Sequence, residues 1–421
     1  KRSPQTVSDV SRFGNESVPA INTQIAAQSV PCYGVTLGDI VYSEGSRNSN
    51  NGLTQMRTHF SKINMPVFQT MGNHDYTYFS PGANVQPKPG RSTVNLVAQE
   101  KFEDCFGPIN HSFNRGNVHF ICMKDIVYNT SSDWDAGSYS GGFTDDQYEW
   151  IKQDLACVPT TMKVVLCVHI PLSTSTSGKH VQDVANLMKK YQNPEIFSGH
   201  THYMRNNRDN SLGIYDHIHS AVCGQWWWSK IEGDGCPNGY KVYTFDGTKI
   251  VNEYFIGVNE GMNTKDFQIR MYRGNLKAGG SYAYFNWNRG DDVILINVFN
   301  AAPDWKVEVY ENNVYKGKAS LISNKKSTFS NIEKGKTYDI PAASSQDWWA
   351  IGYHIGVVGR GTSGTSYYTN CFHVYSYKLT NKSASVKVVA TDSYGNSYTC
   401  TEVIGNNGSG YVTYPSNIKM P

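Results

Sequence analysis

The sequence predicts a two-domain protein in which an α/β domain is followed by an all-β sandwich. β-like segments alternate with helical patterns up to about Val258, and short alternating strands separated by Gly, Asn and Ser turns follow. Polar clusters directly follow the apolar segments of the first half. With 421 residues, the chain is long enough for two or three separately packed cores. The expected domains are residues 1–260 and 261–421.

The α/β domain is expected to begin with a helix over residues 6–28, where apolar residues recur at helical spacing. Pro19 should weaken or kink this helix. Strands are expected at 31–37, 65–71, 163–168 and 195–197, a short helix before the second strand, and amphipathic helices at 145–155 and 181–191.

The second domain is expected to begin after the polar stretch 259–265. Its strands are predicted at 292–298, 306–310, 373–377 and 385–390, where residues alternate or are β-branched.

Composition narrows the function classes. A net charge of +3 without long Lys/Arg runs argues against a nucleic-acid patch, and no apolar stretch reaches the ~20 residues of a transmembrane span. Low charge content (17%) and many aromatics (13%) favour an extracytoplasmic location, either periplasmic, cell-surface or secreted. Oligomeric state cannot be read from these features.

The nine cysteines show no CxxC spacing, so a zinc ribbon is not expected. Cys32, Cys122 and Cys167 are expected to be buried thiols in strands. Two pairings remain open in an oxidising compartment, namely Cys223 with Cys236 and Cys371 with Cys400.

Four short clusters follow the predicted strands of the first half, and each carries a potential metal ligand. They are Gly38-Asp39, Gly72-Asn73-His74-Asp75, His169, and Gly199-His200-Thr201-His202. Because ligands at the carboxyl ends of neighbouring strands converge on one edge of a sheet, these side chains should meet. The metal ligands are therefore predicted to be Asp39, Asn73, His169, His200 and His202.

The mixed oxygen and nitrogen donors suit borderline divalent cations such as Mn, Fe, Zn or Co. Asp39 could give one oxygen to each of two cations, which together could clamp a phosphoryl group and lower the pKa of a bridging water. His200 and His202 alternate, so a turn after Gly199 is needed for both to reach the metals. His74 is the predicted catalytic residue, because it could donate a proton to the departing oxygen.

The order GD, GNHD, an isolated His and GHTH resembles the calcineurin-like metallophosphoesterase superfamily. The resemblance implies a four-layer core of two packed mixed β-sheets flanked by helices, two divalent metal ions, and a metal-activated hydroxide that attacks a phosphate monoester or diester. It also implies that Asp39 bridges the ions, that Asn73, His169 and His200 complete one site, and that His202 belongs to the other.

A finer resemblance points to a Bacteroidetes-type branch of this superfamily, in which a β-sandwich follows the enzyme domain. It rests on Gly224-Gln-Trp-Trp-Trp and on Asp234-Gly-Cys-Pro-Asn-Gly-Tyr. The expected substrate is a small-molecule, glycan-linked or lipid-linked phosphoester.

Two departures leave alternatives open. The first family motif, Asp-x-His/Gln/Gly at a strand end, is not found, so that strand is expected upstream of Lys1. Asp39 and Tyr42 fit the Gly-Asp-x-x-Tyr pattern of purple acid phosphatases, in which the Tyr ligates ferric iron beside a divalent ion. A non-catalytic surface or glycan-binding protein on a decayed phosphoesterase scaffold is the third possibility.

Several other residues have simpler expected roles. Asp75 should hydrogen-bond within its own loop, and His119 should be buried in its strand. Asp125 could touch the site or serve a turn. The tryptophans at 226–228 and 348–349 are expected to pack rather than to bind sugars.

Overall fold

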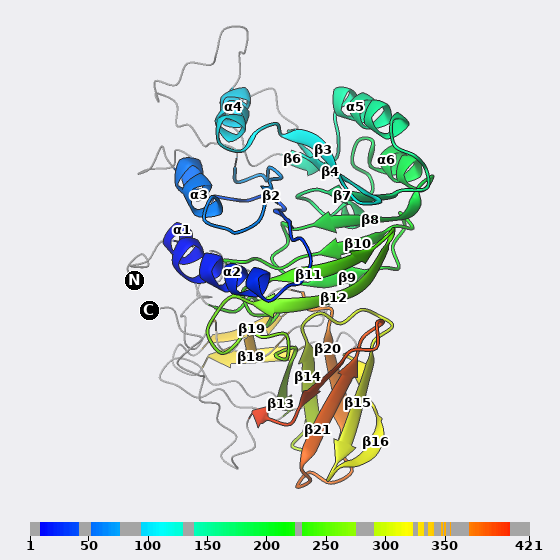
Figure 1. Cartoon of the computed structure of the whole chain (residues 1–421). Coiled ribbons are helices and arrows are strands. Elements are labelled where there is room, and N and C mark those ends of the chain that lie inside the picture. The colour runs from blue at the N-terminus through cyan, green and yellow to red at the C-terminus, as the bar shows by residue number, and fades with distance from the viewer. Residues whose placement is uncertain are drawn as a thin grey trace.

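The structure is a computed structural model that describes residues 9–41, 52–75, 94–128, 139–223, 230–274, 290–322, 327–331, 336–340, 347, 349–350, 354 and 370–404. In Figure 1 the helices and mixed sheets of the first half form the upper part, and the strands of the second half lie below them. Within the described residues, no helix has both the length and the apolar character needed to cross a membrane.

A six-stranded mixed sheet forms the centre of the first half, in the order β3-β4-β7-β8-β10-β9. Strands β4, β7, β8 and β10 are parallel neighbours, while β3 and β9 are antiparallel edge strands. Their bounds are Asn110–Arg115 (β3), Val118–Met123 (β4), Lys163–Cys167 (β7), Gln192–Ser198 (β8), Arg205–Asn207 (β9) and Tyr215–Ile218 (β10).

Two further strand pairs cover one face of this sheet. Strands β1 (Gly34–Val35) and β2 (Val67–Phe68) are parallel, and β11 (Gly239–Asp246) and β12 (Lys249–Gly257) are antiparallel. Both pairs contribute side chains to one cluster with the central sheet, so they form a second layer of strands. A small pair, β5 (Ile126–Tyr128) and β6 (Tyr139–Gly141), follows β4.

Side chains of the central strands alternate between two cores, as the period of a strand requires. In β7, Val164 and Leu166 join the cluster beneath α5 (Asp145–Ala156) and α6 (Val181–Met188), whereas Val165 and Cys167 join the cluster between the two strand layers. Burial on both faces explains why β4 and β7 read as continuous apolar runs. Helix α5 begins at a capping box formed by Thr144 and Gln147.

Helices also cover the outer face of the second strand layer. They are α1 (Asp9–Arg12), the π-helix η1 (Phe13–Ser17), α2 (Val18–Ala26), α3 (Gly52–Phe60) and α4 (Val94–Phe106). A separate buried cluster joins these helices to Met71, Ile126 and Ile170. Helices, strands, strands and helices thus follow one another, which confirms the predicted four-layer core.

The helix predicted over 6–28 is confirmed for its described residues but contains an irregularity. Within η1 the backbone widens, and the amide of Val18 bonds to the carbonyl of Phe13, five residues earlier. Pro19 lies at the start of α2 and has no N–H to donate, so the regular helical ladder is interrupted here.

The second half is rich in strands, as predicted. A five-stranded sheet, β17-β20-β14-β13-β23, and a four-stranded sheet, β16-β15-β21-β22, contribute to one shared apolar cluster. The strands are β13 (Ile269–Arg273), β14 (Val293–Val298), β15 (Lys306–Glu311), β16 (Val314–Lys318), β17 (Ser320–Leu321), β20 (Val374–Lys378), β21 (Val386–Thr391), β22 (Ser397–Cys400) and β23 (Val403–Ile404). A separate pair comprises β18 (Ser327–Asn331) and β19 (Lys336–Ile340).

Two predictions about the first half need correction. The strand predicted at 31–37 pairs only at Gly34 and Val35, and the one predicted at 65–71 only at Val67 and Phe68. Cys122 and Cys167 are buried as predicted, but Cys32 is only half-buried, because it precedes the paired part of β1. The predicted boundary between 260 and 261 falls in the connection between β12 and β13 and stays a prediction.

Candidate metal centre

The four polar clusters meet at one edge of the two strand layers. Asp39 follows β1, Asn73 follows β2, His169 follows β7, and His200 follows β8. Each residue leaves the carboxyl end of its strand, where parallel strands present their ligands. The sequence prediction that these side chains converge is therefore matched by their positions.

Four donor atoms lie within contact of one another in this centre. His169 Nε2 lies 2.9 Å from Asn73 Oδ1, 3.0 Å from His200 Nδ1 and 3.3 Å from Asp39 Oδ1. His200 Nδ1 is 3.1 Å from Asn73 Oδ1. A cation with bonds of ~2.0–2.2 Å would place adjacent ligands ~2.9–3.5 Å apart, so these separations fit the edges of a coordination shell.

The hydrogen-bond partners of His169 show that a proton or a metal ion must lie at its Nε2. Its Nδ1 lies 2.6 Å from the carbonyl oxygen of Leu37, which can only accept a hydrogen bond. In the neutral imidazole the Nε2 lone pair therefore faces the acceptor oxygens of Asn73 and Asp39. Either a proton or a metal ion must stand between these groups, and a hydrogen-bonded Nδ1 is the usual support of a metal-binding histidine.

In the metal-free centre, His169 and Asp39 shift each other's pKa values in opposite directions. Burial alone would lower the pKa of His169, but the Asp39 carboxylate and the Leu37 carbonyl raise it to about 9. Burial would raise the pKa of Asp39, yet the charge and hydrogen bond of His169 hold it well below its usual value.

The other two histidines are held neutral. Burial and then the charge of His169 lower the pKa of His200 to about 3, and burial lowers that of His202 to about 4. Both imidazoles are therefore neutral at physiological pH, which is the form that binds metals.

Two glycines allow the loops to approach closely. A Cβ at Gly38 would lie 2.5 Å from His169 Nδ1, and one at Gly72 would lie 2.2 Å from the backbone nitrogen of Asp39. Gly38 also has a φ of 86°, a conformation that L side chains rarely adopt.

Backbone strain is concentrated at the ligands. Asp39, His200 and His202 have φ values of 54°, 65° and 54°, which are unfavourable for residues with a Cβ. Such conformations accumulate at functional sites. The turn expected after Gly199 is therefore present, and it changes the directions of His200 and His202.

His202 and His74 lie around the four donors rather than among them. In the described part of the chain, the carboxylate and histidine donors that lie within 4.8 Å of one another here belong to Asp39, His169 and His200. After burial, the charges of Asp39, His169 and His74 also act on the pKa of His202, so its ring lies near the same centre. The backbone amide of His74 donates to Asp39 Oδ1 at 2.9 Å. Whether either side chain acts as predicted stays a prediction.

Buried carboxylates hold the loops beneath the ligands. Asp75 accepts hydrogen bonds from the amides of Gly72 (2.8 Å) and Val41 (3.0 Å), which confirms its expected role in its own loop. Asp125 accepts from the amides of His169 (3.0 Å) and Ile170 (3.0 Å), so it positions a ligand rather than serving only a turn. Burial raises the pKa of both carboxyl groups to about 7.

Sequence reasoning missed Asp216. It is fully buried in β10, where its Oδ1 accepts from the hydroxyl of Ser198, just before the Gly199 turn, at 2.6 Å. Its Oδ2 accepts from the amide of Ser173 at 3.1 Å. The only available signal was an acidic residue within an apolar strand segment.

Tyr42 and the tryptophans at 226–228 lie outside the described residues, as does Trp348. Trp349 is 1% exposed and lies under the guanidinium of Arg270, which agrees with the packing role predicted for it. His119 is buried, as predicted, and bonds to Asp154 at 2.8 Å.

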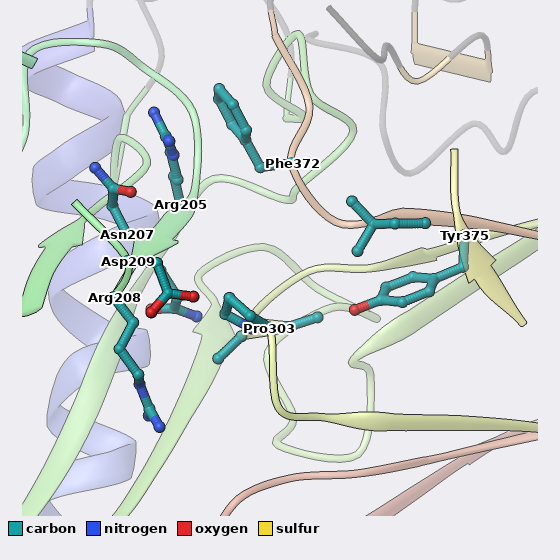
Figure 2. A pocket seen from close by; sticks show the side chains of 11 residues that line it. Arg205, Asn207, Arg208, Asp209, Pro303, Phe372 and Tyr375 are labelled. Atoms are coloured by element: carbon teal, nitrogen blue, oxygen red, sulfur yellow. The ribbon is translucent and has the colours of Figure 1, made fainter. Parts of the chain in front are cut away.

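A hollow of about 330 Å³ lies away from the centre, between β9 and the second half of the chain (Figure 2). None of the candidate ligands lines it. Its two arginines already have partners, since Arg205 lies 4.2 Å from the ring of Phe372 and Arg208 pairs with Asp304 at 2.8 Å. The hollow is therefore a feature separate from the metal centre.

Comparison with known families gives two matches, one after the other along the chain. The model of the calcineurin-like phosphoesterase matches residues 21–204 and thus includes all six predicted site residues. The model of the C-terminal part of calcineurin-like phosphoesterases matches residues 216–398. A search of curated proteins finds no match.

Solved structures give distant similarities. A dimetal phosphatase from Danio rerio is 16% identical, with 49% of this chain and 78% of that chain covered at a TM-score of 0.34. A purple acid phosphatase, PPD1, from yellow lupin is 14% identical, with 77% and 48% covered at a TM-score of 0.31. The sulfate thiohydrolase SoxB of Thermus thermophilus is 13% identical, with 57% and 42% covered at 0.33. Scores this low carry no functional argument.

Proposed function

Because the chain belongs to the calcineurin-like phosphoesterase family, we propose that it hydrolyses phosphate esters at the centre formed by Asp39, Asn73, His169 and His200. The observation that carries the proposal is the meeting of His169 Nε2 with three further donors while its Nδ1 is committed to Leu37. That arrangement accommodates a metal ion in place of the His169 proton and offers it both oxygen and nitrogen ligands.

The residues present fit a divalent metal. Asp39, Asn73, His169 and His200 would hold one ion, and Asp39 with His202 would face a second. When bound, such ions polarise phosphoryl oxygens and lower the pKa of water. Imidazole and carboxylate donors favour Mn, Fe, Zn or Co over Ca.

His74 has the proposed role of proton donor. Its amide is fixed on Asp39 Oδ1, so its ring begins next to the ligand that both ions would share. From there it would donate a proton or a hydrogen bond to the oxygen that leaves phosphorus.

Metal removal and restoration would test the proposal. Purified full-length chain, stripped with a chelator, is assayed on p-nitrophenyl phosphate and bis-p-nitrophenyl phosphate, and then with Mn, Zn or Fe added back. We expect activity that is lost on stripping and returns with a metal, and no activity in His169→Asn. Hydrolysis that is unaffected by chelation, or that persists in the variant, would reject the centre as the active site.

The same assay separates the alternatives. A folded protein that binds metal but hydrolyses neither ester would favour the non-catalytic scaffold. For the purple acid phosphatase alternative, an iron-loaded protein should be coloured, and Tyr42→Phe should abolish the colour. Tyr42 lies outside the described residues, so that alternative rests on the sequence pattern alone.

A further inference from the structure

A second group of metal-binding side chains is buried where the first half of the chain meets the second. Within the described residues, donor atoms of Asp234, Cys236 and His373 lie within 4.8 Å of one another. Asp234 and Cys236 precede β11, and His373 immediately precedes β20. All three side chains are at most 1% exposed. None of them belongs to the centre around Asp39.

The two separations from His373 are close to those of a tetrahedral site. His373 Nε2 lies 3.2 Å from Asp234 Oδ2 and 3.7 Å from Cys236 Sγ. Zinc bonds of ~2.0–2.2 Å to nitrogen or oxygen and ~2.3 Å to sulfur would give ligand separations of ~3.3–3.5 Å and ~3.5–3.6 Å. The donor atoms of Asp234 and Cys236 lie within 4.8 Å of each other, so all three side chains are close enough to approach one ion.

Neighbouring groups fix the imidazole in the metal-binding tautomer. The side-chain amide of Asn297 donates to the Asp234 carbonyl at 2.8 Å and to the Asp347 carboxylate at 2.5 Å, so its Oδ1 is left as an acceptor. His373 Nδ1 lies 2.7 Å from this Oδ1 and must therefore donate to it. The neutral ring then turns its Nε2 lone pair toward Asp234, as His169 does toward Asp39.

A bound divalent cation would be balanced in charge by its ligands. Arg270 is buried, donates to the carbonyl of Gly235 at 2.5 Å, and can offset the carboxylate of Asp347. Burial raises the pKa of Cys236 well above its usual range, so a metal ion would have to displace the thiol proton. Once bound, the Asp234 carboxylate and the Cys236 thiolate would bring a charge of about −2, which a divalent ion would neutralise.

Cys371 supplies a further sulfur nearby. Its Sγ is 3.5 Å from His373 Nδ1 and 3.7 Å from Nε2, so it lies beside the ring rather than in line with Nε2. A rotation about its Cα–Cβ bond would be needed for Sγ to become the fourth ligand. Phe372, between Cys371 and His373, lines the hollow in Figure 2 instead.

We propose that Asp234, Cys236 and His373 form a structural site for a zinc-class divalent cation, with Cys371 as the candidate fourth ligand. The site would join the loop before β11 to the strand that begins after His373. It would also contact the loop that follows β8, because Asp234 Oδ2 accepts a hydrogen bond from the amide of Met204 at 2.7 Å, two residues after His202. The proposal is independent of the phosphoesterase activity.

The presence of sulfur makes the two centres separable by experiment. Among the described residues, no cysteine belongs to the Asp39 centre, so a thiolate-to-cobalt charge-transfer band in the full-length protein loaded with Co²⁺ would not come from that centre. We expect this band in wild type and in His169→Asn, together with an X-ray absorption signal for a zinc–sulfur bond of ~2.3 Å in the zinc form. The band should vanish in Cys236→Ser, whereas Cys157→Ser, at an exposed cysteine, should retain it.

If Cys236→Ser does not fold, measurements on the wild-type protein alone are enough to test the proposal. Absence of the charge-transfer band and of zinc–sulfur scattering in folded wild-type protein would overturn the proposal. So would mass spectrometry that finds Cys236 and Cys371 joined in a disulfide. If hydrogen bonds alone hold the cluster, Cys236 and Cys371 should be free thiols in the folded protein, and unfolding should release no ion from them. That result would also contradict the proposal.

Discussion

Gly72 packs against Asp39 so closely that a Cβ at position 72 would lie 2.2 Å from the Asp39 nitrogen and 2.4 Å from its Oδ1. The candidate centre thus depends on a missing side chain as well as on its donors. The Gly-Asn-His-Asp cluster can bring Asn73 beside the Gly-Asp turn only because its first residue has no side chain.

Gly72→Ala should therefore damage both stability and metal binding. Overpacking of this kind costs about 1–3 kcal/mol, and here the displaced atom includes a ligand oxygen. Thermal unfolding and metal titration should both show the loss. Gly247→Ala is a suitable control, because nothing lies within 4 Å of its added Cβ and its φ of 57° imposes only a backbone cost. Equal metal affinity in Gly72→Ala and wild type would refute the steric argument.

His74→Ala should separate catalysis from metal binding. Loss of a positioned proton donor lowers turnover by ~10²–10⁴-fold, while the four donors around His169 remain in place. Steady-state kinetics and elemental analysis of the same preparation provide the test. His180→Ala, whose ring bonds to Asp145 and Asp183, should behave as wild type in both measurements. Full activity in His74→Ala would exclude the assigned role.

The metal-free protein should lose stability as the pH rises from about 6.5 to about 9. In the folded protein burial opposes the charge on His169, but Asp39 and Leu37 raise its pKa to about 9 from a reference value of 6.5. The folded state therefore binds this proton more tightly, and its contribution is complete below pH ~6.5 and lost as the pH approaches the folded pKa.

Urea unfolding of chelated protein across this window tests that expectation. In His169→Asn the free energy of unfolding should fall less steeply with pH between about 6.5 and 9, because the titrating imidazole is gone. Calorimetric metal titrations near pH 7.5 should in turn show proton release on binding, because the metal replaces that proton. An identical pH dependence in wild type and His169→Asn would contradict the ion pair between His169 and Asp39.

Asp125 should act on the metal through the backbone of His169. In Asp125→Ala the amides of His169 and Ile170 lose their acceptor, at a cost of about 1–3 kcal/mol for each buried group. Metal affinity should fall by ~10–100-fold, as for other groups that support ligands. Asp125→Asn keeps one acceptor oxygen and should be milder in both respects.

Chemical denaturation and competitive metal titration measure the losses of stability and of metal affinity. Asp209→Ala, at an exposed carboxylate, should change neither. Unchanged metal affinity in Asp125→Ala would remove its positioning role.

The sequence was most informative about residues at strand ends. His169 and His200 could be assigned because apolar segments predict β7 and β8, and parallel strands end at one edge. The lengths of β1 and β2 could not be read, since apolar residues around Gly34 and Val67 continue to pack after the ladder has ended. The π-helical turn before Pro19 was foreseen only as a weakness in the helix.

Contacts between distant segments were out of reach. The carbonyl of Leu37 fixes the tautomer of His169 from 132 positions away. Every residue has such a carbonyl, so the sequence does not show which one will bond to the histidine. Likewise, Cys236 was considered as a partner for Cys223, whereas its sulfur lies beside His373, 137 positions later. Both cases depend on how sheets pack, which local patterns do not encode.

Anomalous diffraction from crystals of the full-length protein loaded with Mn²⁺ would locate the ion relative to the four donors. We expect a peak within ~2.0–2.3 Å of Asp39, Asn73, His169 and His200 donor atoms. Its disappearance in His169→Asn should accompany the loss of phosphatase activity. A well-ordered centre that stays empty at saturating metal, or an ion bound elsewhere while hydrolysis continues, would contradict this expectation.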